Sequence, residues 1–432
     1  MGRGYNAIQM SRSRLSYGLP LFFILLFAAS PATAKVLSVG AGQEWSSIAK
    51  ALDAADPGDT LQIFPGTYRE GNIIIRKSIT LIGKDFPTLD GEGKYEILTV
   101  AAADVTIQGL HFYNTGSASI NDIAAIKGLD VHRMKVIGNR FEETFFGIHL
   151  SNSTQSLIEG NTLRGTSGAR IEQHVGNGIH LWKCNNVTIR KNEVYGHRDG
   201  IYFEFVTYSH VIDNYSHQNL RYGLHFMFSN NDEYVNNTFR DNGAGVAIMY
   251  TKGVTMLGNR FEENRGAASY ALLLKDIGDS RIENCRFAGN TVGIYMEGSS
   301  RCLLKGNEFR ENGWALKIQA SCDNNMLTEN NFIANTFDVA TNGSLSLNTL
   351  TGNYWDKYEG YDLNRDGVGD VPFHPVSLYG MIVEKMPTSV MLWRSFLVFL
   401  LDRAEKVVPA VTPENLRDDA PKMKSYDRSI GG

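Results

Sequence analysis

Apolar and polar residues alternate in short runs that return along most of the chain. One run has the form Gly-apolar-x-apolar-x and occurs at residues 147–151, 178–182, 200–204, 223–227 and 245–249. Side chains of a β-strand point alternately to its two faces, so the apolar positions would face a core and the x positions would face outward. This period of two predicts many short strands that each bury one face.

Asparagine recurs at an almost constant interval in the same region. One series comprises Asn139, Asn161, Asn192, Asn214, Asn237, Asn259, Cys285, Asn307, Asn330 and Asn353, and a second comprises Asn219, Asn242, Asn264, Asn290, Asn312 and Asn335. Most successive members lie 22 or 23 residues apart, which is the length of one coil of three short strands. Asparagine tolerates the left-handed backbone of sharp corners, and its amide can bond to the same amide in the next coil.

We therefore predict an all-β fold, a right-handed parallel β-helix over residues 35–358, whose coils bury a core only by stacking. Phenylalanines at equivalent positions would stack inside it, namely Phe141, Phe239, Phe261, Phe287, Phe309 and Phe332. Residues 45–55 have the apolar spacing of a helix that would cap the open end. The N-terminal part resembles the opening of pectin-lyase-like β-helices.

The N-terminus carries the features of a secretory signal. Three arginines precede an apolar stretch at residues 15–27, and small residues at 32–34 suit a signal peptidase. We predict that residues 1–34 are removed on export and that the mature protein is periplasmic. The apolar stretch is shorter than the ~20 residues of a membrane span, and the later apolar run at 391–401 is shorter still.

Charge and cysteine spacing narrow the possible functions. Without residues 1–34 the chain has 39 Lys and Arg against 46 Asp and Glu, a net charge of about −7, since that segment holds three arginines and no acidic residue. A nucleic-acid partner would require a basic face, so we expect none. The four cysteines form no Cys-x-x-Cys pair, which argues against a thiolate metal or redox motif. Cys302 and Cys322 could bridge adjacent coils in an oxidising compartment.

The x positions of the repeated strand form two outward columns. The first comprises His149, His180, Tyr202, His225 and Ala247, and the second comprises Ser151, Trp182, Glu204, Met227 and Met249. Imidazole and thioether groups together suit Cu(I). We predict copper ligands among five of these side chains: His180, Glu204, His225, Met227 and Met249. The long interval before His180 inserts a loop at 164–177, whose His174 could fold over the face.

An aspartate-rich loop follows the last coil. Its oxygen-bearing side chains are Asp362, Asn364, Asp366 and Asp370, and Gly367 permits a tight turn. This is the spacing of a calcium loop, although the terminal glutamate is not at its usual place. We predict a calcium or magnesium site within residues 359–375 that fixes the end of the β-helix; a metal-free turn is the alternative.

Residues 376–432 do not follow the repeat, and they contain an apolar patch. The patch comprises Met391, Leu392, Trp393, Phe396, Val398, Phe399 and Leu400. A short helix would leave many of these side chains facing water, and an exposed patch of this kind marks a binding site. We predict a helical extension that docks onto a membrane partner. The alternative is that it folds back over the last coil and protects its edge.

A C-terminal signature resembles that of one known family. Residues 352–375 read GNYWDKYEGYDLNRDGVGDVPFHP, and with the tail through FLLDRAEKVVP and PENL they are similar to the NosD family. NosD proteins are periplasmic maturation factors for the copper sites of nitrous oxide reductase. The resemblance runs from the signal peptide to the tail.

The resemblance implies a set of partners. NosD proteins work with an ABC transporter made of the ATPase NosF and the membrane subunit NosY, and with the copper chaperone NosL. The system assembles the copper–sulfide site of the reductase. The apolar tail would then dock on the membrane subunit, and membrane contact would occur only through that partner. The resemblance does not identify copper ligands, which depend on the two columns alone.

Two other functions fit parts of the sequence. Many pectin-lyase-like β-helices cleave or epimerise polysaccharides with acids and bases on an outer strand face, and His180, Tyr202 and Glu204, with Lys275 and Asp276 further along, could serve so. Trp182 and Tyr202 would then be stacking platforms for sugar rings. The columns hold a single carboxylate, so a non-catalytic protein is favoured. A metal-free scaffold for the reductase is the third interpretation.

Overall fold

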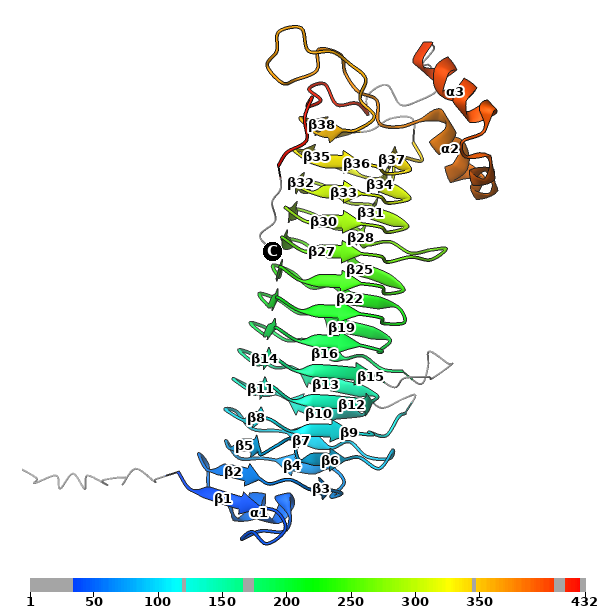
Figure 1. The fold of residues 1–432 in the computed structure, drawn as a ribbon. Helices are drawn as coiled ribbons and strands as arrows, with labels where there is room; N and C mark the ends of the chain where they lie inside the picture. Colours follow the sequence, from blue (N-terminus) through cyan, green and yellow to red (C-terminus); the bar gives the residue numbers. More distant parts are fainter. Residues whose placement is uncertain (1–33, 119–121, 166–174, 344–346, 408–415, 428–432) are drawn as a thin grey trace, which may run out of the picture. The chain divides into compact units, whose positions relative to one another are not determined.

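The computed structural model describes residues 34–118, 122–165, 175–343, 347–407 and 416–427. Most of them form a parallel β-helix of about 13 coils, whose strands line up in three parallel sheets (Figure 1). The predicted right-handed parallel β-helix is confirmed. Residues 1–33 of the predicted signal peptide lie outside the described residues.

Each coil contributes to three sheets, which we name A, B and C. Sheet A contains β1 (Val36–Val39), β2 (Thr60–Ile63), β5 (Thr80–Gly83), β8 (Thr106–Gln108), β11 (Lys135–Ile137), β14 (Leu157–Glu159), β17 (Thr188–Arg190), β20 (His210–Ile212), β23 (Glu233–Val235), β26 (Thr255–Leu257), β29 (Arg281–Glu283), β32 (Leu303–Lys305), β35 (Asp323–Thr328) and β38 (Leu347–Thr351). Sheet B contains β3 (Thr67–Tyr68), β6 (Thr88–Asp90), β9 (His111–Tyr113), β12 (Arg140–Thr144), β15 (Thr162–Gly165), β18 (Glu193–Tyr195), β21 (Tyr215–His217), β24 (Thr238–Arg240), β27 (Arg260–Glu262), β30 (Arg286–Ala288), β33 (Glu308–Arg310), β36 (Asn331–Ile333) and β39 (Tyr354–Trp355). Sheet C contains β4 (Ile73–Ile75), β7 (Leu98–Val100), β10 (Ala124–Leu129), β13 (Phe146–Ser151), β16 (Ile179–Trp182), β19 (Asp199–Glu204), β22 (Tyr222–Met227), β25 (Ala244–Met249), β28 (Leu272–Lys275), β31 (Val292–Glu297), β34 (Trp314–Ile318) and β37 (Phe337–Ala340).

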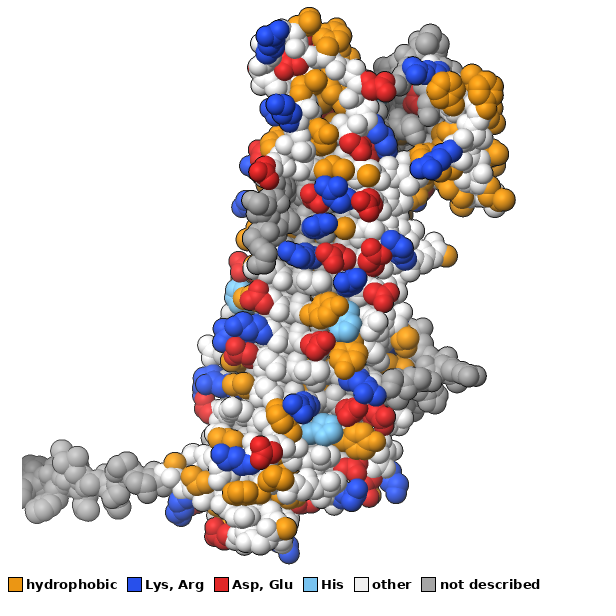
Figure 2. Space-filling view, in the orientation of Figure 1, with side chains coloured by type: hydrophobic (Ala, Val, Ile, Leu, Met, Phe, Trp, Pro, Cys, Tyr) orange, Lys and Arg blue, Asp and Glu red, His pale blue; other side chains and the backbone are white. Residues whose placement is uncertain are grey.

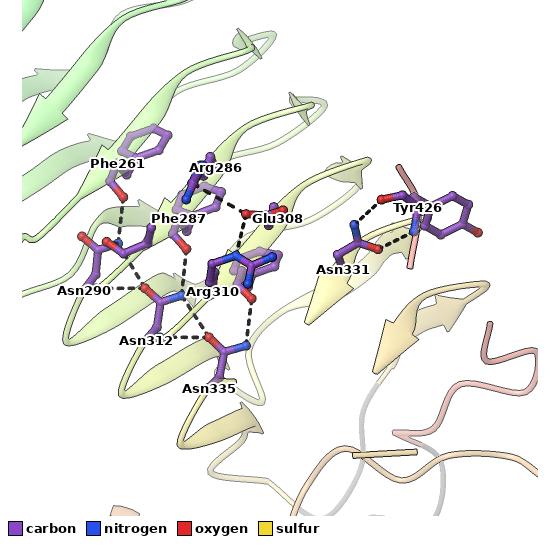
Figure 3. Close-up of polar contacts among 12 residues, drawn as sticks. Phe261, Arg286, Phe287, Asn290, Glu308, Arg310, Asn312, Asn331, Asn335 and Tyr426 are labelled. Atoms are coloured by element: carbon purple, nitrogen blue, oxygen red, sulfur yellow. Dashed lines mark hydrogen bonds and ion pairs between the residues drawn. The ribbon is translucent and has the colours of Figure 1, made fainter. Parts of the chain in front are cut away.

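Both asparagine series form hydrogen-bonded ladders at the corners, and Cys285 interrupts the first of them. In the second series, the Asn290 main-chain N–H and side-chain Nδ2 both donate to Asn312 Oδ1, at 3.0 and 3.1 Å (Figure 3). Asn312 donates to Asn335 in the same way, at 3.0 Å each. Each Nδ2 also donates to a main-chain carbonyl, as Asn290 does to Phe261 at 2.8 Å. The ladders thus satisfy buried amides that would otherwise oppose folding.

The interior is an apolar stack, as the sequence predicted. Ring centroids of Phe261, Phe287, Phe309 and Phe332 follow one another at 4.7, 4.9 and 4.8 Å. The stack ends on Trp355, whose ring lies 4.0 Å from Phe332. These rings lie inside the coil because the alternation of each strand points them there.

A helix covers the N-terminal end of the stack, again as predicted. α1 (Ile48–Ala54) begins after Ser47, whose side chain accepts from the Lys50 N–H. Glu70 accepts the free N–H groups of the first turn, including that of Ile48 at 2.8 Å. Lys77 Nζ donates to three carbonyls at the C-terminal end, the shortest being that of Ala55 at 2.7 Å. Both ends of α1 are therefore satisfied by coils of the β-helix.

A helical segment packs on the outward face of the last strands of sheet C. It consists of α2 (Leu378–Lys385), the 3-10 helix η2 (Pro387–Leu392) and α3 (Phe396–Val407). Its buried cluster comprises Phe337, Tyr379, Val383 and Val398, with Trp314 packed against it. Lys317 of β34 and Glu384 of α2 form an ion pair at 2.6 Å. The predicted helical extension is present, and it covers the same sheet face that carries the two columns, three coils beyond Met249.

Residues 416–427 return to the β-helix and cover its last coil. Asp418 is fully buried and accepts from the main-chain N–H groups of Gly352 and Asn353, from Asn353 Nδ2 and from Trp355 Nε1, at 2.9 to 3.1 Å. It thereby takes the next place in the first asparagine ladder. Asn331 and Tyr426 exchange two hydrogen bonds at 2.9 and 3.0 Å (Figure 3). The alternative that the tail folds back over the last coil holds for this part of the extension.

The four cysteines are free and buried, so the suggested bridge is absent from the structure. The reason is register: the Cys302 N–H donates to Asn325 Oδ1 at 2.9 Å, so Asn325 and not Cys322 faces Cys302 in the next coil. Burial raises the pKa of the Cys302 thiol to about 12. Within the described ranges, no helix is long and apolar enough to cross a membrane.

Candidate functional site

The second predicted column is formed on sheet C. Glu204 of β19 pairs with Met227 of β22, and Met227 pairs with Met249 of β25. Paired residues of neighbouring parallel strands lie about 4.8 Å apart and point the same way. All three side chains are partly exposed. Two thioethers and one carboxylate therefore stand in a row on the outer surface.

The first column lies beside it and is less accessible. His149, His180, Tyr202 and His225 follow in register, with ring centroids 4.7, 4.7 and 5.1 Å apart. Burial lowers the pKa of His149, and burial with the charges of His149 and Arg198 lowers the pKa of His180 well below its ordinary value. These imidazoles are then neutral near pH 7, the form that binds metals. Burial also raises the pKa of Tyr202 to about 12.

A third outward column contains a buried acid that the sequence analysis missed. Asp199 has no exposed surface, and its Oδ2 lies 3.8 Å from His225 Nδ1 and 3.6 Å from Arg198 Nε. His225 itself is 7% exposed. Neither carboxylate oxygen of Asp199 and neither nitrogen of His225 has a hydrogen-bond partner among the described residues. Buried polar atoms without such partners are costly, which marks this pair as a functional candidate.

Alternation gave no signal for Asp199. In four of the five Gly-apolar-x-apolar-x runs the residue before the glycine also lies on the strand, as the pairing of Asp199 with Tyr222 shows. Strict alternation would place this residue on the inward side with Ile201 and Phe203. Asp199 lies instead beside the outward His225, so the repeat could not have predicted its position.

The predicted ligands are gathered on one face but do not form a closed site. Within the described ranges, no three His, Cys, Asp or Glu side chains converge as a metal-binding group. Tyr202 Oη lies 3.5 Å from Glu204 and occupies the register between His180 and His225. His174 and most of the inserted loop lie outside the described residues.

The aspartate-rich loop is a turn held by its own side chains. Asp362 accepts from the N–H groups of Asp366 and Gly367 at 3.2 and 2.9 Å, and Asp366 accepts from Val368 at 2.8 Å. Asp370 accepts from the Leu363 N–H at 2.7 Å, and Asn364 Nδ2 donates to Asp366 at 3.1 Å. These hydrogen bonds explain the regular spacing of the oxygen-bearing side chains, because each one holds the loop in a turn. The calcium or magnesium site stays a prediction.

The predicted docking patch is largely exposed. Hydrophobic side chains gather over the helical extension in Figure 2, and the exposed ones comprise Met391, Leu392, Trp393, Phe396, Phe399 and Leu400. Val398 is different, because it is buried against Phe337 and Tyr379. It anchors α3 to the β-helix and adds no exposed surface to the patch.

The sequence is similar to that of known proteins over most of its length. A family model described as periplasmic copper-binding protein (NosD) matches residues 165–360. A probable ABC transporter binding protein NosD of Stutzerimonas stutzeri is 25% identical over 408 residues, which cover 90% of this chain and 92% of that protein. The protein of the same name from Pseudomonas aeruginosa is 28% identical over 396 residues, covering 86% and 89%.

Solved structures share the fold alone. A Yersinia enterocolitica exopolygalacturonase aligns with a TM-score of 0.53 and 10% identity over 74% of this chain and 78% of that chain. The catalytic unit of a Streptomyces thermodiastaticus α-1,3-glucanase aligns with a TM-score of 0.52 and 15% identity over 71% and 65%. Similarity over most of the chain to two NosD proteins, the matched family model and the β-helix together support membership of this chain in the NosD family.

Proposed function

We propose that this protein handles copper in the periplasm as an accessory factor that assists assembly of the copper–sulfide site of nitrous oxide reductase. It works with the transporter subunits NosF and NosY and with the chaperone NosL, and it has no catalysis of its own. The family description supports a periplasmic copper-binding role, and the names of the relatives support association with an ABC transporter.

The observation that carries the proposal is the in-register pair Met227 and Met249. Methionine thioethers are soft ligands that favour Cu(I), and adjacent strands hold these two at the spacing of one coil. Glu204 extends the row by one coil. A surface with no ligand to bind would gain nothing from two aligned methionines beside buried histidines.

Asp199 would act on copper through His225. A metal-binding imidazole usually offers its second nitrogen to a carboxylate, which fixes the orientation of the ring. His225 Nδ1 faces Asp199, so Nε2 is the nitrogen left for a metal. His180 would contribute a second neutral imidazole one register step beyond Tyr202.

The copper role is tested by anaerobic titration of residues 35–432 with Cu(I) against a competing chelator. We expect the double variant Met227→Leu/Met249→Leu to bind at least tenfold more weakly, and His225→Ala to bind several-fold more weakly. Met326→Leu removes an exposed thioether from sheet A and should change nothing. A parent protein that does not compete for Cu(I) would favour the metal-free scaffold.

Docking to the membrane subunit is proposed for the exposed patch on the helical extension. Replacing Met391, Phe396 and Phe399 with serine should abolish co-purification with NosF and NosY while leaving the melting temperature unchanged, because these side chains face water. Deleting the whole of 376–432 would not test this, since residues 416–427 cap the β-helix. A serine variant that still co-purifies would refute the docking role.

A polysaccharide-modifying enzyme remains the alternative. Asp199 and His225 offer an acid and a base on the face where β-helix enzymes place theirs. The closure of their polar atoms from solvent weighs against this function, because a polymer must reach the reacting groups. Loss of uronate-polymer turnover in His225→Ala, if turnover exists in the parent, would establish it.

A further inference from the structure

A row of aromatic side chains borders the candidate copper face. Phe205, Phe228 and Tyr250 stand at the same place in three successive coils, and we name them the aromatic ridge. Phe228 and Tyr250 directly follow Met227 and Met249 in the chain. The Phe205 N–H donates to Met227 O at 3.2 Å and the Phe228 N–H to Met249 O at 3.1 Å, which fixes their register.

The backbone of the ridge is one that aromatic residues rarely adopt. The φ angles of Phe205, Phe228 and Tyr250 are +56°, +52° and +55°. This left-handed region suits glycine and asparagine, whereas a bulky side chain there is strained. Neighbouring coils do hold such residues at this place, for example Asn152 and Gly298. Three consecutive strained aromatics therefore need a reason outside folding.

The same three side chains face water. They are 44%, 41% and 44% exposed, so the burial of their rings explains little of their presence. Neighbouring rings stack nearly parallel, at 13°, with centroids 5.3 and 5.1 Å apart. The ring faces thus cover one another and the ring edges point outward.

The exposed ring edges of the aromatic ridge indicate which kind of ligand it could bind. A sugar ring stacks on an aromatic face, so a row of edges is a poor sugar platform. A lipid surface calls for a basic cluster, yet the ridge is bordered in register by one lysine, Lys183, and one aspartate, Asp276. Thioether sulfur, in contrast, packs favourably at the edge of an aromatic ring.

The neighbouring metal candidate has two partly exposed soft ligands. Met227 and Met249 contribute two thioethers, and among the described residues no set of three His, Cys, Asp or Glu converges there. A soft ligand from a second protein would complete the coordination of Cu(I). The ridge borders these thioethers, since Phe228 and Tyr250 directly follow Met227 and Met249 in the chain.

We propose that the aromatic ridge docks an apolar, methionine-bearing segment of a partner protein, whose thioether completes the coordination of copper held at Met227 and Met249. The inference rests on the proposed copper function. It assigns the ridge to recognition of the partner and the two methionines to the metal.

Asparagine substitutions separate docking from folding. Phe228→Asn/Tyr250→Asn removes two edges and relieves the strained backbone, so the melting temperature should stay the same or rise. Tyr208→Asn is the matched control: Tyr208 has a φ of +53° and is 54% exposed, but it lies three residues after Phe205 in the connection between β19 and β20 and is not part of the ridge. A role in structure alone would make the double variant less stable.

The experiment is an anaerobic Cu(I) competition titration of residues 35–432, with and without a soluble synthetic peptide that carries two methionines in an aliphatic segment. We expect the peptide to raise the apparent Cu(I) affinity of the parent at least tenfold. A peptide with norleucine in place of methionine should not raise it. In Phe228→Asn/Tyr250→Asn the affinity without peptide should stay within twofold of the parent, and the gain should fall below threefold. Tyr208→Asn should keep the full gain.

Several results would overturn the proposal. These are a gain that survives in the double variant, a gain lost equally in Tyr208→Asn, or a double variant with a lower melting temperature. Binding of lipid vesicles or oligosaccharides, or self-association, that the double variant loses would assign the ridge to another occupant. A parent that binds no Cu(I) in either titration contradicts the copper function instead. Docking is then decided by calorimetric binding of the metal-free methionine peptide, which must be lost in the double variant.

Discussion

The corners of the β-helix and the outward face of sheet C treat buried polar groups in opposite ways. At a corner, Asn259 is fully buried, accepts two hydrogen bonds from Asn237 at 2.9 and 3.0 Å, and donates to Tyr234 O at 2.7 Å. On the face, Asp199 and His225 are almost equally buried. Their side-chain polar atoms have no hydrogen-bond partner among the described residues.

The difference distinguishes hydrogen bonds that stabilise the fold from buried groups that are candidates for function. A satisfied buried amide contributes about 1 kcal/mol, whereas an unsatisfied buried group costs about 1–3 kcal/mol. The ladders repeat because each coil that joins them gains a satisfied amide. His197 and Asp232 also carry buried polar atoms without a hydrogen-bond partner in the described part of the chain. Asp199 and His225, however, lie together on adjacent strands next to the methionines. A functional site departs from local consistency in this way.

The largest stability effect is expected at the end of the first ladder. Asp418→Ala removes an acceptor that serves four donors of the last coil, all of them left buried. We expect the free energy of unfolding to fall by about 3–5 kcal/mol. Urea unfolding followed by circular dichroism measures it. Asp419→Ala, one residue away and exposed, is the control, and equal midpoints for the two variants would show that residues 416–427 do not cap the helix.

A buried acid near the ladders predicts a dependence on pH. Burial raises the pKa of Asp232 to about 8, against about 4 in an unfolded chain. Between these values the folded chain holds a proton that the unfolded chain has lost, so stability falls as the pH rises through this window and levels off above pH 8. Asp232→Asn keeps the acceptor for the Ser209 N–H and cannot ionise.

The asparagine variant should therefore gain on the parent by up to about 1.4 kcal/mol per pH unit, and by about 2 kcal/mol in all between pH 6 and pH 8, because the slope halves at the pKa. Unfolding midpoints at pH 5, 6, 7 and 8 measure the difference. Asp213→Asn changes an exposed carboxylate and should run parallel to the parent. A constant difference across this range would contradict the assigned pKa of Asp232.

Much of the fold could be predicted because its signals are local. The spacing of asparagines and the Gly-apolar-x-apolar-x runs specify coil length and strand register, so Glu204, Met227 and Met249 were placed correctly. Asp418 could not be placed, since it completes a ladder 65 residues after Asn353 and shares no repeat with it. The aromatic ridge was missed for another reason: no propensity rule expects aromatic residues in the left-handed region.

A smaller effect is expected in the middle of the ladder. Asn259→Leu removes both the acceptor for Asn237 and the donor to Tyr234 O, and should lower the free energy of unfolding by roughly 1–3 kcal/mol. The next coil offers the reverse test, because Cys285 interrupts the series and Asn259 Nδ2 reaches its sulfur only at 3.9 Å. Cys285→Asn should restore the ladder and add about 1 kcal/mol. Melting temperatures that move in the same direction in both variants would rule out a stabilising ladder.

The smallest expected change in the free energy of unfolding tests the difference between the corners and the face of sheet C most directly. The double variant Asp199→Leu/His225→Leu removes both members of a poorly satisfied buried pair. Replacement of such a pair by apolar side chains is often neutral or stabilising. We expect the double variant to lie within about 1 kcal/mol of the parent, on the more stable side. Each single variant should be less stable than the double variant, because one polar group stays buried without its partner. Urea unfolding of the two single variants and the double variant measures this cycle. A double variant that loses as much stability as Asn259→Leu would mean that Asp199 and His225 stabilise the fold as the corner asparagines do and are not kept for function.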